Sequence, residues 1–270
     1  MRPLSLASRP SRADRVFLAG LGCSAALYAG LILAMLVADA SFTRPGELWE
    51  ALQKPAIRHA IRLSLWSTTA SALLSVLVAV PAGYLLARHR FRGRALLDAL
   101  FDLPIVLPPM VVGLSLLILF QTPLGQALES VVPVTYRTPS VVLAQFAVAA
   151  AFALRTMRLA FDQLDPRCEE IALTLGCDRS RAFWYVALPS AQRGVLGAFL
   201  LAWARAFGEF GPVLVFSGAT RMRTEVLPST VFLELSVGEI EAAVAVSLLM
   251  VIVALCVLLG ARALLPEEPR

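Results

Sequence analysis

Apolar residues follow one another along most of this chain in long runs, and charged residues gather between the runs. Six of the runs reach about 20 residues, the length with which a helix crosses the hydrocarbon core of a bilayer. The apolar positions are continuous and do not alternate, which favours helices over the strands of a membrane barrel. The pattern predicts an all-α integral membrane protein with six transmembrane helices, at residues 16–38, 60–87, 96–120, 140–161, 194–217 and 242–265.

Composition agrees with this fold class. Hydrophobic residues make up 58% of the chain and charged residues 16%, whereas a soluble domain averages about 25% charged residues. The net charge of +5 would suit a nucleic-acid partner, but topology explains it better. With a cytoplasmic N-terminus, 16 of the 24 Lys and Arg residues lie in inner segments, seven in outer segments and Arg205 within a span. The positive-inside rule therefore places both termini in the cytoplasm, and no nucleic acid is implied.

A single transmembrane domain accounts for nearly the whole chain. We expect a cytoplasmic tail at 1–15, the membrane domain at 16–265 with a long cytoplasmic loop at 165–190, and a second cytoplasmic tail at 266–270. The first span has an alternative interpretation as a signal peptide, because Ala38-Asp39-Ala40 imitates a cleavage site. Its apolar run exceeds the roughly 7–15 residues of a signal-peptide core, which favours a retained helix.

Prolines interrupt the third span. Pro104, Pro108 and Pro109 follow closely on Asp102, and three prolines remove three backbone donors, so the helix is predicted to bend or break. A broken helix is tolerated in lipid only where protein buries it or where it lines a cavity. Two interpretations stay open for these four residues, a substrate pathway and a purely structural kink.

The fifth span carries an arginine, Arg205, near its middle. Such a charge costs at least about 2.5 kcal/mol unless it is paired or hydrated. Glu209 lies one helical turn later on the same face, so the two side chains can pair. The same helix has a ridge of small residues that permits close helix contact, formed by Ala198, Ala202 and Ala206. The pair either locks helices together or borders a translocation path.

Several kinds of catalytic and metal chemistry are absent from the sequence. The only lysine, Lys54, precedes Pro55, so the chain cannot supply the Gly-Lys-Ser/Thr of a Walker A loop and any ATP must be bound by a partner. The four cysteines lack the spacing of zinc ligands, and the two histidines are far apart. We therefore predict no catalytic residue, no metal site and no cofactor on this chain, which disfavours an intramembrane enzyme.

The cytoplasmic loop contains the signals of two short helices joined by a turn. Asp165 and Pro166 suit a helix start, and Gly176 suits its end. Asp178 or Ser180 can cap a second helix, and Pro189 is expected to follow its end. The apolar sides are predicted at Ile171, Ala172 and Leu175 in the first helix and at Phe183, Val186 and Ala187 in the second. Such an element either lies on lipid or docks a cytoplasmic partner.

This loop resembles the EAA motif of bacterial ABC-importer permeases. The positions that carry the resemblance are Glu170, Ala172, Gly176, Val186, Leu188 and Pro189. The chain departs from the pattern at Ile171, where the family has Ala, and at Val186, where it has Ile. In that family the loop forms the coupling helices, which sit in a cleft of the ATP-binding subunit. The resemblance therefore implies a docking role for the loop.

Two further segments, 98–113 and 204–211, resemble the molybdate-type permeases, whose sulfate and tungstate relatives also import tetrahedral oxyanions. The resemblance implies a type I ABC-importer permease and adds Gly208 and Gly211 to Arg205 and Glu209 as candidates for the path or its gate. Departures at Pro212, 216–219 and 224–228 leave the exact solute open.

The family resemblance also implies the assembly and the mechanism. We expect a multi-pass protein of a bacterial-type inner membrane, surrounded by lipid and paired with a second copy or a paralogue. Two cytoplasmic ATPases would bind ATP with Mg²⁺, and an extracytoplasmic binding protein would deliver molybdate for import by alternating access. Alternatives are sulfate, tungstate, a polyamine, ferric ion or a phosphonate. A channel or secondary transporter would need matched broken helices, and prolines mark a break in the third span only.

Overall fold

The computed structural model describes residues 12–42 and 45–264, and the regular structure within these ranges is helical. Four helices are long and apolar enough to cross a membrane, and two bent helix pairs bring the number of spans to six. The predicted all-α membrane fold is thus confirmed. Residues 1–11 of the predicted N-terminal tail, Leu265 and the tail 266–270 lie outside the described residues.

The helices of the N-terminal half are α1 (Arg12–Phe42), α2 (Pro45–Gln53), α3 (Pro55–Arg88), α4 (Arg94–Val106), α5 (Pro109–Gln121), α6 (Pro123–Val131) and α7 (Thr138–Asp162). Those of the C-terminal half are α8 (Arg167–Thr174), α9 (Arg179–Ala182), the π-helical turn η1 (Phe183–Ala187), α10 (Leu188–Ser190), α11 (Gln192–Phe207), α12 (Gly211–Ser217), α13 (Leu227–Val237) and α14 (Ile240–Leu264). Helix α1 begins at Arg12, within the segment expected to be a tail.

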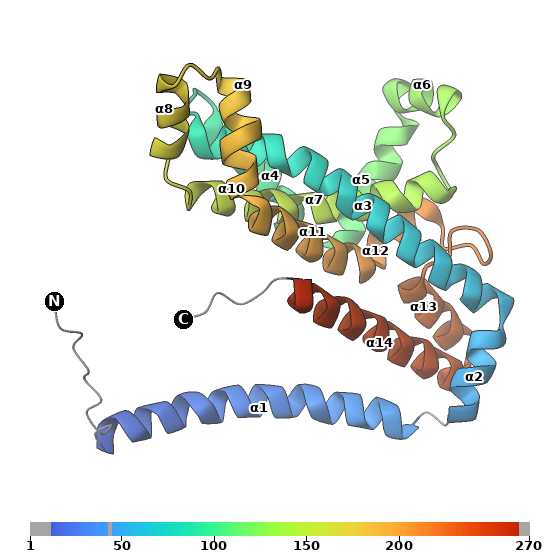
Figure 1. Ribbon diagram of the computed structural model, residues 1–270. Helices are drawn as coiled ribbons and strands as arrows, with labels where there is room; N and C mark the ends of the chain where they lie inside the picture. Colours follow the sequence, from blue (N-terminus) through green and yellow to red (C-terminus); the bar gives the residue numbers. More distant parts are fainter. Residues whose placement is uncertain (1–11, 43–44, 265–270) are drawn as a thin grey trace.

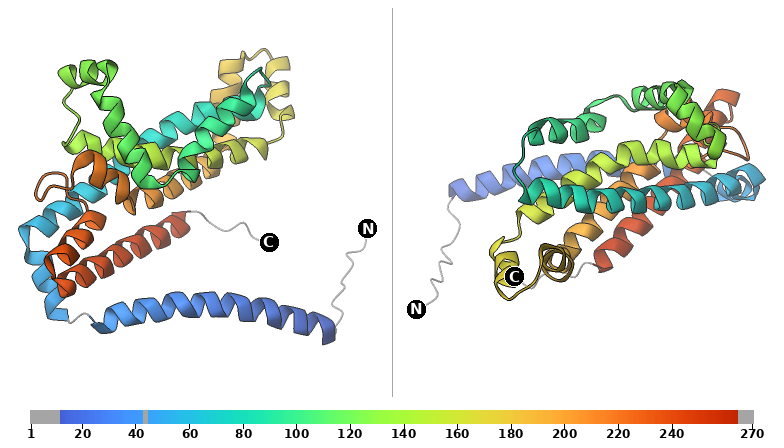
Figure 2. Two further views of the ribbon diagram at one scale, coloured as in Figure 1. Left: turned by 180° about the vertical axis from the view of Figure 1, so that it is seen from behind. Right: turned by 90° about the horizontal axis from the view of Figure 1, so that it is seen from above.

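Helices α3, α7 and α11 form the centre of the molecule (Figure 1). The short helices α8 and α9 lie at one end of these long helices, and α2, α6 and α13 lie at the other end. Helix α1 runs apart from the bundle, with α14 between them (Figures 1 and 2). The sequence did not predict the short helices α2, α6 and α13, of which α13 is apolar but too short to span.

Small residues allow the central helices to approach closely. A Cβ placed on Gly83 of α3 would lie 3.0 Å from the Met157 Cβ of α7, so only glycine fits there without a shift. Ser71 Oγ donates to the Val142 carbonyl at 2.9 Å and ties α3 to α7 again. In lipid, helices associate through such close packing and interhelical hydrogen bonds, because apolar burial alone gives them no drive to pair.

Two of the six spans are broken. Helices α4 and α5 meet at 113° across Leu107 and Pro108, as the prolines predicted. Helices α11 and α12 meet at 63° across the segment 208–210. From the sequence, a break was expected at the prolines of the third span only. The second break lies at the Gly-Glu-Phe segment 208–210, and Gly211 and Pro212 open the next helix directly after it. Pro212 lacks the N–H that would bond back across the break, and tertiary contacts fix the bend.

Candidate functional site: a docking element and a crossing of broken spans

Residues 165–190 fold into a compact unit, here called the docking element. Asp165 Oδ1 accepts a hydrogen bond from the Arg167 N–H at 3.0 Å, and α8 follows. Gly176 ends it at a φ of +91°, a conformation that an L side chain rarely adopts. Asp178, and not Ser180, caps α9 by accepting from the Arg181 N–H at 2.7 Å. The predicted helix, glycine turn and second helix are present.

The end of the second helix differs from the prediction. Pro189 does not follow the helix but lies within it, because α9, η1 and α10 run on without interruption from Arg179 to Ser190. The Leu188 N–H bonds to the Phe183 carbonyl five residues back, which defines a π-helical turn. A π turn shifts the register of the backbone bonds by one residue, and it stands immediately before the proline that cannot donate one.

The docking element has a buried side and an exposed apolar side. Ala172, Ala182 and Ala187 face inward and are buried. Ile171 and Leu175, predicted to share the inward side of α8 with Ala172, are instead exposed, and Leu175 is 81% exposed. Trp184 and Tyr185 are exposed as well. Ile171 is one residue from Ala172 and so points to another face of α8. Leu175 is three residues on, but it lies past Thr174, the last residue of α8. The outward side is an apolar surface.

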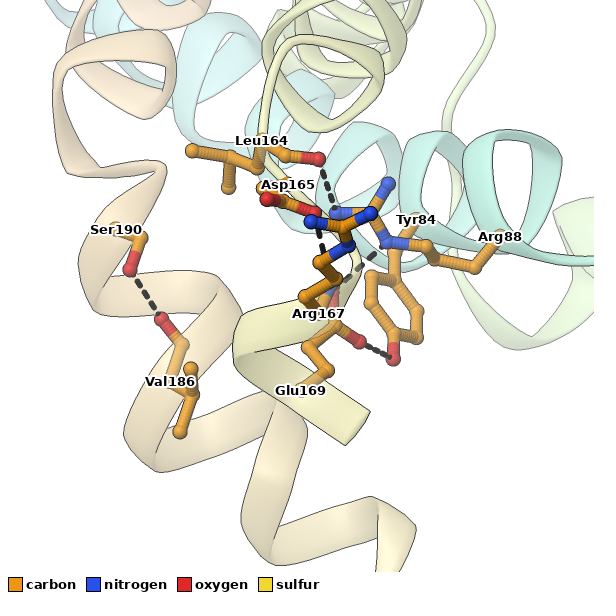
Figure 3. A network of polar contacts seen from close by, with 8 residues as sticks. All are labelled: Tyr84, Arg88, Leu164, Asp165, Arg167, Glu169, Val186 and Ser190. Carbon is orange, nitrogen blue, oxygen red and sulfur yellow. Dashed lines mark hydrogen bonds and ion pairs between the residues drawn. The ribbon is translucent and has the colours of Figure 1, made fainter. Parts of the chain in front are cut away.

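A carboxylate that the motif comparison overlooked fixes α8 to the bundle (Figure 3). Glu169 Oε2 accepts from the Tyr84 hydroxyl at 2.6 Å, and Oε1 accepts from Arg88 Nε at 2.8 Å. Arg88 Nη2 also donates to the Leu164 carbonyl at 3.1 Å. Sequence reasoning missed this triad because Tyr84 and Arg88 are more than 80 residues away. The motif residue beside it, Glu170, is exposed.

The triad borders a cavity of about 470 Å³ between α3, α8 and α9. Its walls combine charged groups with an aromatic side, and they include Arg88, His89, Glu170, Arg179 and Phe183. Of the other motif positions, Val186 accepts a hydrogen bond from Ser190 Oγ at 2.6 Å and Leu188 starts α10. The motif residues thus gather on one element at one end of the molecule.

The two broken spans cross at their breaks. A Cβ on Gly113 of α5 would lie 2.7 Å from the Pro212 Cα, and one on Gly211 would lie 3.1 Å from the Met110 backbone nitrogen. Pro108 caps α5 and Pro109 is its first residue. The candidates Pro108, Pro109 and Gly211 are therefore brought together, although they are about 100 residues apart. Gly208 ends α11 immediately before the second break.

Arg205 and Glu209 form the ion pair that the sequence predicted. The Glu209 side chain is only 2% exposed and that of Arg205 is 28% exposed. The Arg205 guanidinium also lies 5.5 Å from the centre of the Phe152 ring, within range of a cation–π contact. The pair lies beside the second break. A buried carboxylate there is matched by a cation, so the crossing has no unpaired charge from these two residues.

Asp102 and Pro104 do not join this crossing. Asp102 lines a separate cavity of about 230 Å³ between α4 and α7, next to Asp98, Arg155 and Arg158. Arg158 pairs with Asp98 and lies 3.7 Å from Asp162. Pro104 lies inside α4, one turn before the break. The four residues proposed together in the third span thus occupy two different environments.

The opposite end of the molecule holds buried acids that the sequence did not reveal. Glu225 is fully buried and neither carboxylate oxygen has a hydrogen-bond partner. Burial raises the pKa of Glu225, and Thr230 and Arg221 nearby oppose this only in part. Glu234 is buried too, and pairs with Arg221 at 2.8 Å and Lys54 at 3.9 Å. Among residues 12–42 and 45–264, no group of His, Cys, Asp or Glu could hold a metal ion.

Comparison with known proteins decides the family. Residues 79–267 match the model of the binding-protein-dependent transport system inner membrane components. The chain belongs to this family. The matched residues include the docking element and both broken spans.

The names of curated relatives agree with this family. The molybdenum transport system permease protein ModB of Mycobacterium tuberculosis is 38% identical over 81% of this chain and 83% of its own. The molybdate/tungstate permease WtpB of Pyrococcus furiosus is 35% identical over 73% and 75%. The sulfate permease CysT of Escherichia coli is 32% identical over 80% and 79%. These relatives are transport subunits, so the chain is an ABC-importer permease and not an enzyme.

A solved structure supports the fold. The bacterial alginate ABC transporter, crystallised with an alginate-bound periplasmic protein, contains a chain that superimposes with a TM-score of 0.74. The match covers 93% of both chains at 16% identity. At this identity the likeness concerns the fold alone.

Proposed function

We propose that this permease imports an oxyanion, with molybdate as the first candidate and tungstate and sulfate next. The observation that carries the proposal is the set of relatives. Those named for molybdenum, molybdate/tungstate and sulfate transport are 32–38% identical over 73–81% of the chain. The paired state of Glu209 adds support, because an anion path should be neutral or positive at its narrowest.

We place the permease in a complex with a second copy or a paralogue, two cytoplasmic ATPases and an extracytoplasmic binding protein. The exposed apolar side of the docking element suits burial against an ATPase that binds ATP with Mg²⁺. Helix α1 buries none of its apolar length in the monomer, which suits contact with lipid and a second subunit. Both termini then face the cytoplasm, and the complex works by alternating access.

ATP-driven uptake of labelled molybdate by the reconstituted complex tests the proposal, with unlabelled tungstate, sulfate, spermidine and ferric citrate as competitors. We expect uptake that tungstate and sulfate reduce, and that Gly176→Val abolishes, because a β-branched residue is forced to a φ of +91°. Gly197→Ala is the matched control, since nothing lies within 4 Å of its added Cβ. Uptake of a polyamine or iron alone, or uptake without ATP, would contradict the proposal.

A further inference from the structure

The docking element is joined to the membrane helices by the backbone at both its ends and by side chains at a third place. The short segment 163–166 links α7 to α8. The second half of the element continues through η1 and α10 directly into α11. Its first helix, α8, packs on α9 and η1 inside the element and buries Ala172. The bonds from Glu169 to Tyr84 and Arg88 provide the polar connection from α8 to the long helix α3. Helix α8 is thus tied to α3 through side chains, in addition to its backbone link to α7.

Low exposure and several hydrogen bonds hold the side chains of this connection in place, although it lies at one end of the molecule. The Arg88 and Glu169 side chains are 11% and 12% exposed, so removing one leaves the other charge shielded from water without its counter-charge. The bonds are charge-assisted and short, and a second bond to the Leu164 carbonyl fixes the direction of Arg88.

Aromatic neighbours hold the remaining member of the triad. The Tyr84 ring lies 5.4 Å from Phe161 of α7 and 4.7 Å from Phe183 of η1, both edge-to-face. Its hydroxyl is therefore aimed at Glu169 by packing against two other elements. A displacement of α8 would have to move this ring and Arg88 together.

Helix α3 extends this connection across the molecule. Its 34 residues correspond to about 50 Å at 1.5 Å per residue. Along its length it packs on α7 and α11, and Trp203 of α11 donates to Thr69 at 3.2 Å. Near its far end, Ser64 Oγ accepts from the Leu227 N–H at 2.8 Å, at the start of α13. The same helix therefore contacts both ends of the permease.

We propose that Glu169 is a positioning residue for transport, which passes movement of the docking element to α3 through Tyr84 and Arg88. Movement of α3 then reaches the outer end through the Ser64–Leu227 bond. Glu170 stays exposed and free to meet the ATPase. The two neighbouring glutamates thus have different roles, because Glu170 faces the ATPase and Glu169 faces the helix bundle. The inference rests on the proposed ATP-driven import.

The test uses the full reconstituted complex with Glu169→Gln, Tyr84→Phe and Arg88→Gln, normalised to assembled complex. We expect ATP hydrolysis to persist, because the exposed side of the element is unchanged. The number of oxyanions moved per ATP should fall by roughly fivefold or more, a typical coupling between two sites. Arg90→Gln is the matched control, since Arg90 is an exposed arginine two residues beyond Arg88.

A double variant that exchanges the two charges distinguishes a role in transmitting movement from a role in protein stability alone. Combining Arg88→Glu with Glu169→Arg should recover part of the lost ratio, whereas each single reversal should not. An unchanged ratio in all three first variants would overturn the inference. A proportional loss of hydrolysis and transport would overturn it too, because the triad would then serve docking alone.

Hydrogen exchange gives a readout that does not depend on the solute. In the wild-type complex, ATP with vanadate should change exchange in residues 55–68 of α3 and 218–230, and the Glu169→Gln complex should show no such change. If wild-type protein shows the exchange change but moves no oxyanion, the proposed substrate fails and the inference stands. If exchange at these residues responds to ATP equally in both complexes, the inference fails whatever the solute is.

Discussion

The third and fifth spans both break within the membrane, but different residues break them. In the third span, Leu107 precedes Pro108 and has an extended backbone, and Pro109 starts the next helix. In the fifth span, Gly208 ends α11 at a φ of −86°, which any residue can adopt. Glu209 follows and pairs with Arg205 one turn back. Gly211 and Pro212 then open α12. The first break thus rests on two consecutive prolines, whereas the second combines one proline with an ion pair and close packing.

This difference explains why the sequence marked the first break, with two consecutive prolines, more strongly than the second, with one. A proline removes a donor and restricts the residue before it whatever its surroundings. A glycine only permits a bend, and packing must select it. Here the selecting contacts are between Gly211 and Met110 and between Gly113 and Pro212, so the proline-driven break supplies the surface that fixes the other one.

If contacts hold the fifth span bent, removing the cation that pairs with the buried Glu209 carboxylate should have the largest effect. Arg205→Ala leaves the Glu209 carboxylate buried without a partner, which costs about 3 kcal/mol or more. We expect loss of assembled complex and of transport, measured by thermal unfolding in detergent and by uptake. Glu209→Gln should alter mainly transport, because Arg205 is partly exposed and can be hydrated.

The double variant Arg205→Ala with Glu209→Gln is the control for this prediction. It removes both charges, so the complex should recover much of the thermal stability lost in Arg205→Ala. Wild-type uptake in both single variants would exclude a role for the pair in the bend and in transport.

Disturbing the contact between the two breaks should have the next largest effect. Gly113→Ala puts a methyl group 2.7 Å from the Pro212 Cα, and backbone cannot move aside as a flexible side chain can. Overpacking of this kind costs about 1–3 kcal/mol. A lower unfolding temperature is expected, with Gly197→Ala as the control on α11. Equal unfolding temperatures for the two variants would show that the breaks do not depend on each other.

In the docking element, too, some features depend on nearby residues in the sequence and others on residues far away in it. Asp165, Gly176 and Asp178 act on backbone groups a few residues away, so their roles could be predicted from the sequence. The π turn before Pro189 could not, because the pattern of backbone bonds there depends on how η1 packs. Glu169 was missed since its partners lie on α3. The six spans were predictable because apolar length alone sets them.

A smaller effect is expected from the proline that sets the first break. Pro108→Ala restores a backbone donor and frees Leu107 to become helical. Loss of a compatible proline costs roughly 0.4–1 kcal/mol through the unfolded chain. Spin labels at Leu100 and Leu114 should report a broader distance distribution than in wild type. An unchanged distribution would mean that contacts with α12 hold the 113° bend as well.

The smallest effect should come from Gly208→Ala. This change tests whether the bend requires a glycine at this position or merely tolerates one. The nearest atom to the added Cβ is the Ala204 carbonyl oxygen at 3.9 Å, an ordinary contact. Since the backbone at Gly208 suits any residue, the unfolding temperature should stay within error or rise slightly, as less freedom is lost on folding. Uptake should also persist if the bend is static. Normal stability with a large loss of uptake would instead show that Gly208 changes conformation during transport, and the fifth break would then be a hinge that the third break is not.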